Sequence, residues 1–292
     1  ALGSEASPLL LFAGVALVSV ALLFKVAAVP FQFWTPDVYQ GAPSPMVAWM
    51  ASGVKVAGFA GLIRVFYLGF GAYAVDWQPM FYFVAVLTLL VGSVLAVVQT
   101  DVKRMMAYSS INHAGFVLVG VQAATQEGVQ AALFYLATYT FLIAGTFGVI
   151  TLVGRRGDGH HSLDDYRGLG RSRPGLALLM TVFLFAQAGV PLTSGFFAKF
   201  YVINAAVDAG STSLAVIAML SSVISAFLYL RITVSLYMSD PDDATAAPRL
   251  AVPAGAGIAL ALCVAVTLVV GVWPGSISEV ARDAVPVLTT LG

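Results

Sequence analysis

Charged residues are scarce in this sequence, and their scarcity argues against a soluble protein. They make up 10% of the 292 residues, whereas soluble domains carry about 25%. The 14 basic and 14 acidic residues cancel to a net charge of zero, so no basic surface for nucleic acid is indicated. Apolar residues are correspondingly abundant: they account for 60% of the chain and give a mean hydropathy of +0.93.

Residues that hold metals or redox cofactors are also few. The single cysteine, Cys263, lies in an apolar run, which excludes a disulfide framework and a thiolate cluster. His160 and His161 have no third ligand at a suitable spacing, and we interpret them as solvated loop histidines. The sequence contains no dinucleotide-binding glycine fingerprint and no paired histidines in apolar segments. It therefore predicts no metal and no cofactor in this chain.

Apolar windows of about 20 residues recur along the chain, and each is long enough to cross the ~30 Å hydrocarbon core of a bilayer. The windows are continuous rather than alternating, which excludes a β-barrel, and no amphipathic helices remain to cover a soluble core. We predict an all-α polytopic membrane protein with about eight transmembrane helices. The expected spans are 8–40, 45–70, 79–99, 104–124, 128–153, 175–207, 212–238 and 252–273.

Two expected spans are too long for one upright helix. Residues 8–40 and 175–207 would each form about 50 Å of helix, and each contains a proline, Pro30 in AAVPFQFW and Pro191 in AGVPLTSGF. We predict that each helix is broken near its proline. Non-helical backbone at membrane depth is tolerated only inside protein or beside water. Broken helices in corresponding positions indicate a transport site between inverted repeats.

The loop at 154–174 predicts the orientation of the chain in the membrane. By alternation it lies on the same side as the turn that holds Lys103 and Arg104 and as the acidic loop at 239–251. The positive-inside rule makes this side cytoplasmic. The arginines of the loop are Arg155, Arg156, Arg167, Arg171 and Arg173.

Lysine occurs only four times, and three of the four lie within expected spans: Lys25, Lys55 and Lys199. An ionisable side chain in the bilayer costs at least about 2.5–3.5 kcal/mol and indicates a functional site. Lysine, unlike arginine, can lose its proton when it is desolvated. We interpret these three as groups for proton transfer or ion pairing. Lys103 follows Asp101 at a helix start, and we interpret it as a snorkelling side chain.

His113 is central in its span, in AYSSINHAGF. Because histidine titrates near neutral pH, it could relay protons between the lysines; a structural hydrogen bond between helices is the alternative. Tyr135 and Tyr139 share one face of the next helix and could line a hydrated path, although packing is the preferred account of both. Arg64 and Arg231 are interpreted as anchors near span ends. Every carboxylate falls at an end or a turn, so an acidic partner for the lysines must come from outside this chain.

Four longer motifs carry a family resemblance: FKVAAVPFQFWTPDVYQGAPSP, SGVKVAGF, TDVKRMMAYSSINHAGF and GVPLTSGFFAKFYV. They resemble the antiporter-like membrane subunits of proton-pumping NADH:quinone oxidoreductase, respiratory complex I. The WTPDVYQGAP form is similar to the subunit N branch of that family. Subunits of multi-subunit sodium/proton antiporters and of membrane-bound hydrogenases share the lysines and the proline breaks, and they are the alternative.

The resemblance implies a fold of two inverted five-helix repeats, each with a broken helix. The end of the first repeat would occupy 1–70, with the broken helix 8–40 and the helix 45–70. The second repeat would occupy 71–238, and a last transmembrane helix with a tail would occupy 239–292.

The resemblance also implies a role for each candidate residue. Lys25 matches the lysine of the first broken helix, Lys55 the lysine of the following helix, His113 the central relay position, and Lys199 the lysine of the second broken helix, facing the far exit. The family's glutamate partner of Lys25 lies on an earlier helix that is absent here. Since the first residue is Ala1, we expect the chain to be a C-terminal portion of the subunit.

The expected function is proton translocation driven by quinone reduction elsewhere in the complex. The chain would be a subunit of an oxidoreductase without a redox site of its own, and NADH, FMN, iron–sulfur clusters and quinone would belong to partner subunits. The expected partners are other membrane-arm subunits, including neighbouring antiporter-like ones, in the lipid bilayer of a bacterial inner membrane. A passive structural subunit is the other class to consider, and three lysines within spans argue against it.

Overall fold

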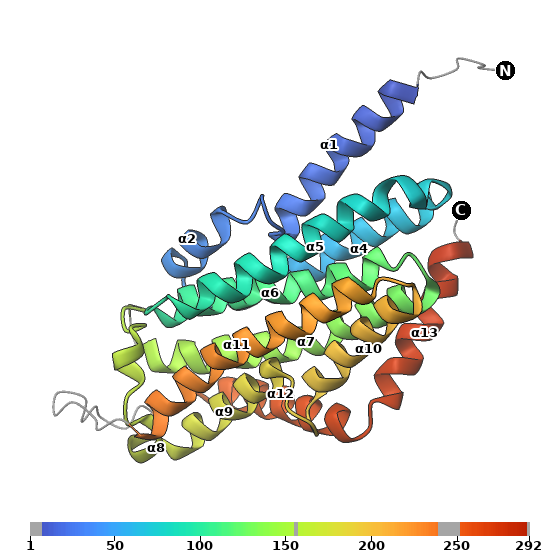
Figure 1. The fold of residues 1–292 in the computed structure, drawn as a ribbon. Helices are drawn as coiled ribbons and strands as arrows, with labels where there is room; N and C mark the ends of the chain where they lie inside the picture. Colours follow the sequence, from blue (N-terminus) through green and yellow to red (C-terminus); the bar gives the residue numbers. More distant parts are fainter. Residues whose placement is uncertain (1–7, 155–156, 239–251, 291–292) are drawn as a thin grey trace.

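The computed structural model describes residues 8–154, 157–238 and 252–290, and these residues form helices joined by short connections, without a β-strand (Figure 1). The predicted all-α class is confirmed. Ala1, Arg155, Arg156 and the acidic loop at 239–251 lie outside the described residues.

The observed helices agree with the predicted spans within a few residues, except that α5 begins at Ala74 rather than at 79. The elements in chain order are α1 (Pro8–Val26), α2 (Trp34–Gly41), α3 (Ser44–Trp49), the π-helical η1 (Met50–Val54), α4 (Lys55–Ile63), the π-helical η2 (Arg64–Gly69), the 3-10 helix η3 (Gly71–Tyr73), α5 (Ala74–Val97), α6 (Val102–Gln122), α7 (Gln126–Gly154), the 3-10 helix η4 (Leu163–Tyr166), α8 (Leu169–Ser172), α9 (Pro174–Ala188), α10 (Ser194–Asp208), α11 (Thr212–Met238), α12 (Ala254–Val272) and α13 (Gly275–Thr290).

The first predicted break is confirmed between α1 and α2, with Pro30 inside it. Backbone groups released by the break find partners on side chains. The N–H of Val29 donates to Thr88 Oγ1 of α5 at 3.0 Å, and Trp34 Nε1 donates to the carbonyl oxygen of Phe24 at 3.0 Å. These bonds make a non-helical segment tolerable at membrane depth, because an unpaired buried peptide group is costly.

The second predicted break is confirmed between α9 and α10. Gly189 ends α9 with a φ of +92°, a left-handed conformation that favours glycine. A Cβ on Gly195, in the first turn of α10, would overlap the carbonyl group of Ala186. The two halves therefore meet backbone to backbone, which only a glycine allows at this position.

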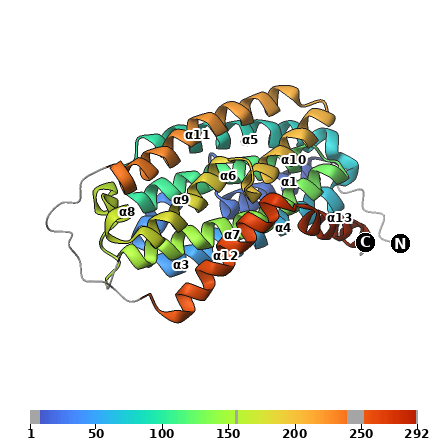
Figure 2. The ribbon, with the colours of Figure 1, turned by 90° about the horizontal axis from the view of Figure 1, so that it is seen from below.

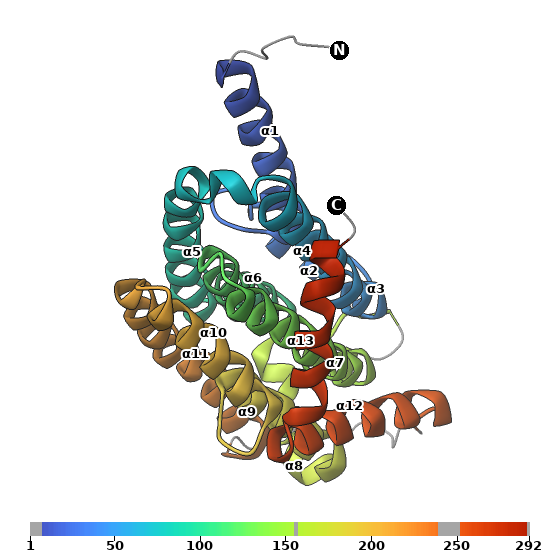
Figure 3. The same ribbon diagram turned by 90° about the vertical axis from the view of Figure 1, so that its right-hand side faces the viewer.

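Helix α6 forms the centre of the bundle. Of its 21 residues, 19 are buried, and Figure 3 shows it enclosed by α4, α5, α7, α10 and α11. Helices α5 and α6 approach closely, since a Cβ on Gly92 would lie 2.6 Å from the backbone nitrogen of Asn112. Figure 2 shows α12 crossing α7 and α9 on one side of the bundle, with α13 continuing from it.

The predicted number of eight membrane spans is not confirmed. Among the described residues, five helical segments are long and apolar enough to cross a membrane, and α1 and α9 include shorter apolar helices. Helix α6 does not qualify because it carries polar residues, which face other helices rather than lipid. The five segments are Ser44–Gly69, Gly71–Val97, Gln126–Gly154, Thr212–Met238 and Ala254–Val272.

Helix α13 was not predicted, because its residues were assigned to a tail. It runs across the end of the bundle away from α8 (Figures 1 and 3) and packs mainly on α7. Ala281 and Val285 are buried, whereas Glu279, Arg282 and Asp283 are exposed. A short helix with one apolar and one charged face is typical of a helix that lies along a membrane surface.

Candidate functional site

Lys55 opens α4 directly after the π-helical segment η1, and its side chain is buried, with 4% exposed. Its Nζ donates to the carbonyl oxygen and to Oγ of Ser110 on α6, both at 2.6 Å. The ammonium position lies 5.8 Å from the centroid of the Tyr139 ring. Single π turns often occur at functional sites, and here one precedes the buried lysine.

His113 lies between two tyrosine hydroxyl groups in the middle of α6. Its Nδ1 is 2.6 Å from the hydroxyl of Tyr135 on α7, and its Nε2 is 3.1 Å from the hydroxyl of Tyr229 on α11. The Tyr139 ring lies 4.8 Å away, centroid to centroid. A neutral imidazole donates from one nitrogen and accepts at the other. A proton taken up at one nitrogen can therefore leave from the other.

Lys199 on α10 reaches back to the second break. Its Nζ donates to the carbonyl oxygen of Ala188, the last residue of α9, at 2.9 Å and to Ser222 Oγ of α11 at 2.8 Å. The Phe116 ring lies 5.0 Å away, from Nζ to the ring centroid. The carbonyl at the end of the broken helix thus accepts a hydrogen bond from the buried amine.

Lys55, His113 and Lys199 have hydrogen-bond partners of one kind, and the sequence could not show which groups these are. Among the described residues, no carboxylate pairs with either lysine or with the imidazole, and their partners are hydroxyl and carbonyl oxygens. These neutral oxygens accept a hydrogen bond from an ammonium or from a neutral amine. The surroundings thus leave both protonation states of each lysine hydrogen-bonded.

Lys25 is not gathered with the other three residues. It lies exposed in the last turn of α1, where α1 projects away from the bundle (Figure 1). No hydrogen bond or ion pair joins its amine to another described residue. Lys25 lies beside the first break, as predicted, but its side chain is exposed rather than buried.

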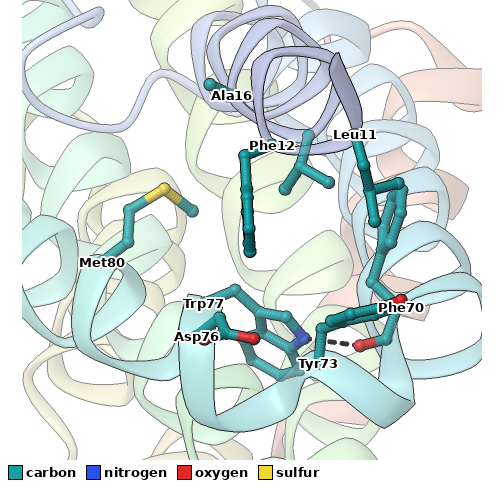
Figure 4. A pocket seen from close by; sticks show the side chains of 9 residues that line it. Leu11, Phe12, Ala16, Phe70, Tyr73, Asp76, Trp77 and Met80 are labelled. Atoms are coloured by element: carbon teal, nitrogen blue, oxygen red, sulfur yellow. Dashed lines mark hydrogen bonds between the residues drawn. The ribbon is translucent and has the colours of Figure 1, made fainter. Parts of the chain in front are cut away.

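The pocket beside α1 is separate from the buried lysines. Figure 4 shows Leu11 and Phe12 of α1 facing Trp77 and Tyr73. The cavity between them has a volume of about 160 Å³. Its walls are almost wholly apolar, and Trp77 uses its one donor on the carbonyl oxygen of Phe70. The pocket therefore offers mainly packing surface for apolar groups, and Tyr73 and Asp76 are the titratable residues among its lining.

Sequence reasoning missed the polar residues that α9 and α11 bring to the site. On α11, Tyr229 contacts His113 and Ser222 contacts Lys199. On α9, Gln187 is fully buried and donates to Thr146 Oγ1 at 2.8 Å. Helix α11 was interpreted as an apolar span with Arg231 as an anchor near its end. A signal was present, because its serines recur at helical spacing within an apolar run.

Lys103 does not snorkel, and that interpretation is wrong. Its side chain is 1% exposed, and its Nζ lies 2.9 Å from Asp158 Oδ2 and 2.7 Å from the carbonyl oxygen of Ala42. Asp158 also accepts from the backbone N–H and the hydroxyl of Ser44, both at 2.7 Å. The loop after α7 therefore brings a carboxylate to the start of α6, a contact that sequence separation concealed.

The two loop histidines behave differently. His160 is exposed, as predicted. His161 is buried, and its Nε2 lies 2.8 Å from Asp158 Oδ1, so its interpretation as a solvated residue is wrong. The carbonyl oxygen of His161 accepts from the N–H of Val102 at 2.7 Å. Within the described residues, no group of three or more metal-ligating side chains lies close enough together to hold an ion.

The Lys103–Asp158 pair predicts how stability depends on pH. Partial burial opposes ionisation of Asp158, but hydrogen bonds from Lys103, Ser44 and His161 outweigh it and hold the pKa of this carboxyl well below its ordinary value. A lowered pKa contributes stability above the ordinary value of about 3.9, and this contribution is lost as the pH falls toward the folded-state pKa. We expect thermal unfolding in detergent to show this loss in the wild type.

Removing the carboxylate should leave a buried lysine without its charge partner. Asp158→Ala is expected to cost about 3–5 kcal/mol and to remove most of the acid-dependent loss. Asp164→Asn is the matched control in the same loop, because Asp164 pairs with Arg167 while 63% exposed. Equal melting temperatures for the two variants at neutral pH would contradict this account of the ion pair.

Two broken helices, the second with its end facing a buried amine, define a class, the antiporter-like polytopic membrane proteins. The family model described as NADH:quinone oxidoreductase/Mrp antiporter, TM, matches residues 3–225, and the chain belongs to this family. It is a multi-pass protein of a bacterial inner membrane.

The relatives agree with this assignment. The chain is 49% identical over 275 residues to NADH-quinone oxidoreductase subunit N of Thermobifida fusca, covering 93% of this chain and 50% of that protein. A chain of respiratory complex I from Thermus thermophilus is 32% identical with a TM-score of 0.80, covering 95% of this chain and 61% of that one. A chain of the Mrp complex from a Dietzia species has a TM-score of 0.87 at 23% identity, over 98% and 61% of the two chains, which shows the fold alone. The chain spans about half the length of the curated relatives it matches.

Proposed function

We propose that this chain is the proton-translocating part of subunit N of a bacterial NADH:quinone oxidoreductase, complex I. One observation carries the proposal: Lys55, His113 and Lys199 are buried in the centre of the bundle and bonded to oxygens that tolerate either protonation state. Lysines held in this way can take up and release protons without leaving a fixed charge unpaired. A passive structural subunit would have no use for them.

The relay would run along α6 from one break to the other. Lys25 would exchange protons with a group on a neighbouring helix, and Lys55 would pass them along α6 through Ser110 to His113. Lys199 would release them beyond the second break. The residues fall into the end of a first repeat at 1–70, a second repeat at 71–238 and a C-terminal part at 239–292, as the family resemblance implies.

The driving reaction would take place in other subunits. NADH, FMN, iron–sulfur clusters and quinone are assigned to those partners, and this chain would contribute no redox centre to the oxidoreductase. Its partners would be the other membrane-arm subunits, including neighbouring antiporter-like ones, and lipid. A sodium/proton antiporter is the weaker alternative, because the higher sequence identities are to subunit N.

Replacement of Lys55 tests the relay directly. We expect Lys55→Ala in the full-length subunit to leave assembly intact and to lower proton pumping and the coupled quinone reductase rate by about tenfold or more, because a proton-transfer group is lost. Pumping would be measured in membrane vesicles and normalised to assembled complex. Arg64→Ala is the control, since Arg64 carries a positive charge on the same helical span but is exposed. Full pumping by an assembled Lys55→Ala complex would exclude the relay role.

A further inference from the structure

Among the described residues, no hydrogen bond joins His113 of α6 directly to Lys199 of α10. Lys199 Nζ lies over the Phe116 ring at 5.0 Å, and Phe116 stacks on Tyr135 at 6.0 Å between centroids. The Tyr135 hydroxyl in turn bonds His113. A phenyl ring neither donates nor accepts a proton, so this connection between the imidazole and the amine is interrupted by an apolar side chain.

Helix α11 contacts both groups from the side. Its Tyr229 hydroxyl lies 3.1 Å from His113 Nε2, and its Ser222 Oγ lies 2.8 Å from Lys199 Nζ. The two residues are seven positions apart, which is two turns or about 10.5 Å along the helix. They therefore lie on one face of α11, and that face reaches from the imidazole to the amine.

A third hydroxyl lies between them on the same face. Ser225 is three positions from Ser222 and four from Tyr229, the spacing of neighbours on a helix surface. Its Oγ donates to Asn112 Oδ1 at 3.1 Å, and Asn112 directly precedes His113. Ser225 is 2% exposed and Tyr229 is fully buried.

These hydroxyl groups are directed across the helix interface. Serine and threonine within a helix often bond the carbonyl oxygen four residues earlier, as Thr233 does with Tyr229. These three hydroxyls instead bond groups of other helices. Ser222 accepts from Lys199 of α10 and donates to the carbonyl oxygen of Ala188 of α9 at 3.4 Å, and Ser225 and Tyr229 bond side chains of α6. The Tyr229 hydroxyl also lies 2.7 Å from Ser109 Oγ of α6. A hydroxyl can donate and accept at once, so this face can pass a proton on.

We propose that Ser222, Ser225 and Tyr229 form a proton route between His113 and Lys199 that passes around Phe116. The route rests on the proposed function and adds α11 to it. A protonated His113 gives its Nε2 proton to the Tyr229 oxygen, which releases its own proton toward Ser225. Water molecules bridge neighbouring hydroxyl groups. Ser222 donates the last proton to a neutral Lys199 amine. Each hydroxyl group then carries one proton, as it did before the transfer.

The test compares variants of the full-length subunit in assembled complex. We expect the double variant Ser222→Ala, Ser225→Ala to lower proton pumping and the coupled quinone reductase rate by about tenfold. We also expect its coupled rate to slow more in D₂O than the wild-type rate does, because proton transfer then limits turnover. The double variant Ser222→Thr, Ser225→Thr restores the hydroxyls and should recover both values. Tyr229→Phe should behave like the alanine pair. Thr233→Val is the control, since it removes a hydroxyl of α11 that bonds its own helix.

The outcomes separate this inference from the proposed function. If the alanine pair and Tyr229→Phe pump like Thr233→Val while Lys199→Ala and His113→Ala do not pump, the hydroxyl route is refuted and the relay stands. If all of these variants pump normally, both are refuted. A rate loss that threonine does not restore, with an unchanged solvent isotope effect, would assign the serines to packing and overturn the route.

Discussion

Lys199→Arg is expected to impair proton pumping more than Lys199→Glu does. A proton-releasing group must titrate, and arginine remains protonated at any accessible pH. Glutamate reverses the sign of the charge but can still take up and release a proton. In the structure, the partners of Lys199 are the neutral oxygens of Ala188 and Ser222. Among the described residues, glutamate would meet no carboxylate there that opposes its ionisation.

The opposite order is expected if Lys199 is a structural anchor. Arginine would then keep the hydrogen bonds to the end of α9, and glutamate would lose them. Pumping in vesicles, normalised to assembled complex, distinguishes the two accounts. Arginine close to wild type with glutamate inactive would refute the relay role of Lys199.

Gly195→Ala is expected to disrupt the second break itself. The added methyl group would overlap the carbonyl group of Ala186, and neither backbone can move without separating α10 from α9. Overpacking of this kind typically costs about 1–3 kcal/mol or more. Because the same break aligns Ala188 with Lys199, we expect less assembled complex and, in what assembles, slower pumping.

Gly175→Ala is the matched control for this substitution. Gly175 belongs to α9, the other half of the broken helix, and a Cβ there would meet nothing within 4 Å. Assembly and pumping should stay at wild-type levels, and thermal unfolding of the purified complex provides an independent measure. If Gly195→Ala assembles and pumps at the level of Gly175→Ala, the close approach of the two half-helices is not required for assembly or pumping.

Much of the fold was predictable because it follows from local chemistry. The apolar runs and the prolines at 30 and 191 predict membrane helices and two breaks, and both breaks occur. Lys55 and Lys199 were identifiable because an ionisable group in an apolar run is costly and needs a functional reason. Helix α13 was missed because its charged residues alternate with apolar ones on a helical period, in a segment too polar to count as a span.

The sequence by itself determined that the chain is a membrane protein with two broken helices and buried titratable side chains, because these depend on residues close together in the chain. Only the tertiary structure decided which groups surround those side chains. Asp158 pairs with Lys103 across 55 positions, and Tyr229 reaches His113 across 116. Helix packing creates such contacts, and no local pattern encodes which faces will meet. The same packing leaves Lys25 exposed on α1 and sets Phe116 beside Lys199, so that α11 becomes the polar connection within the site.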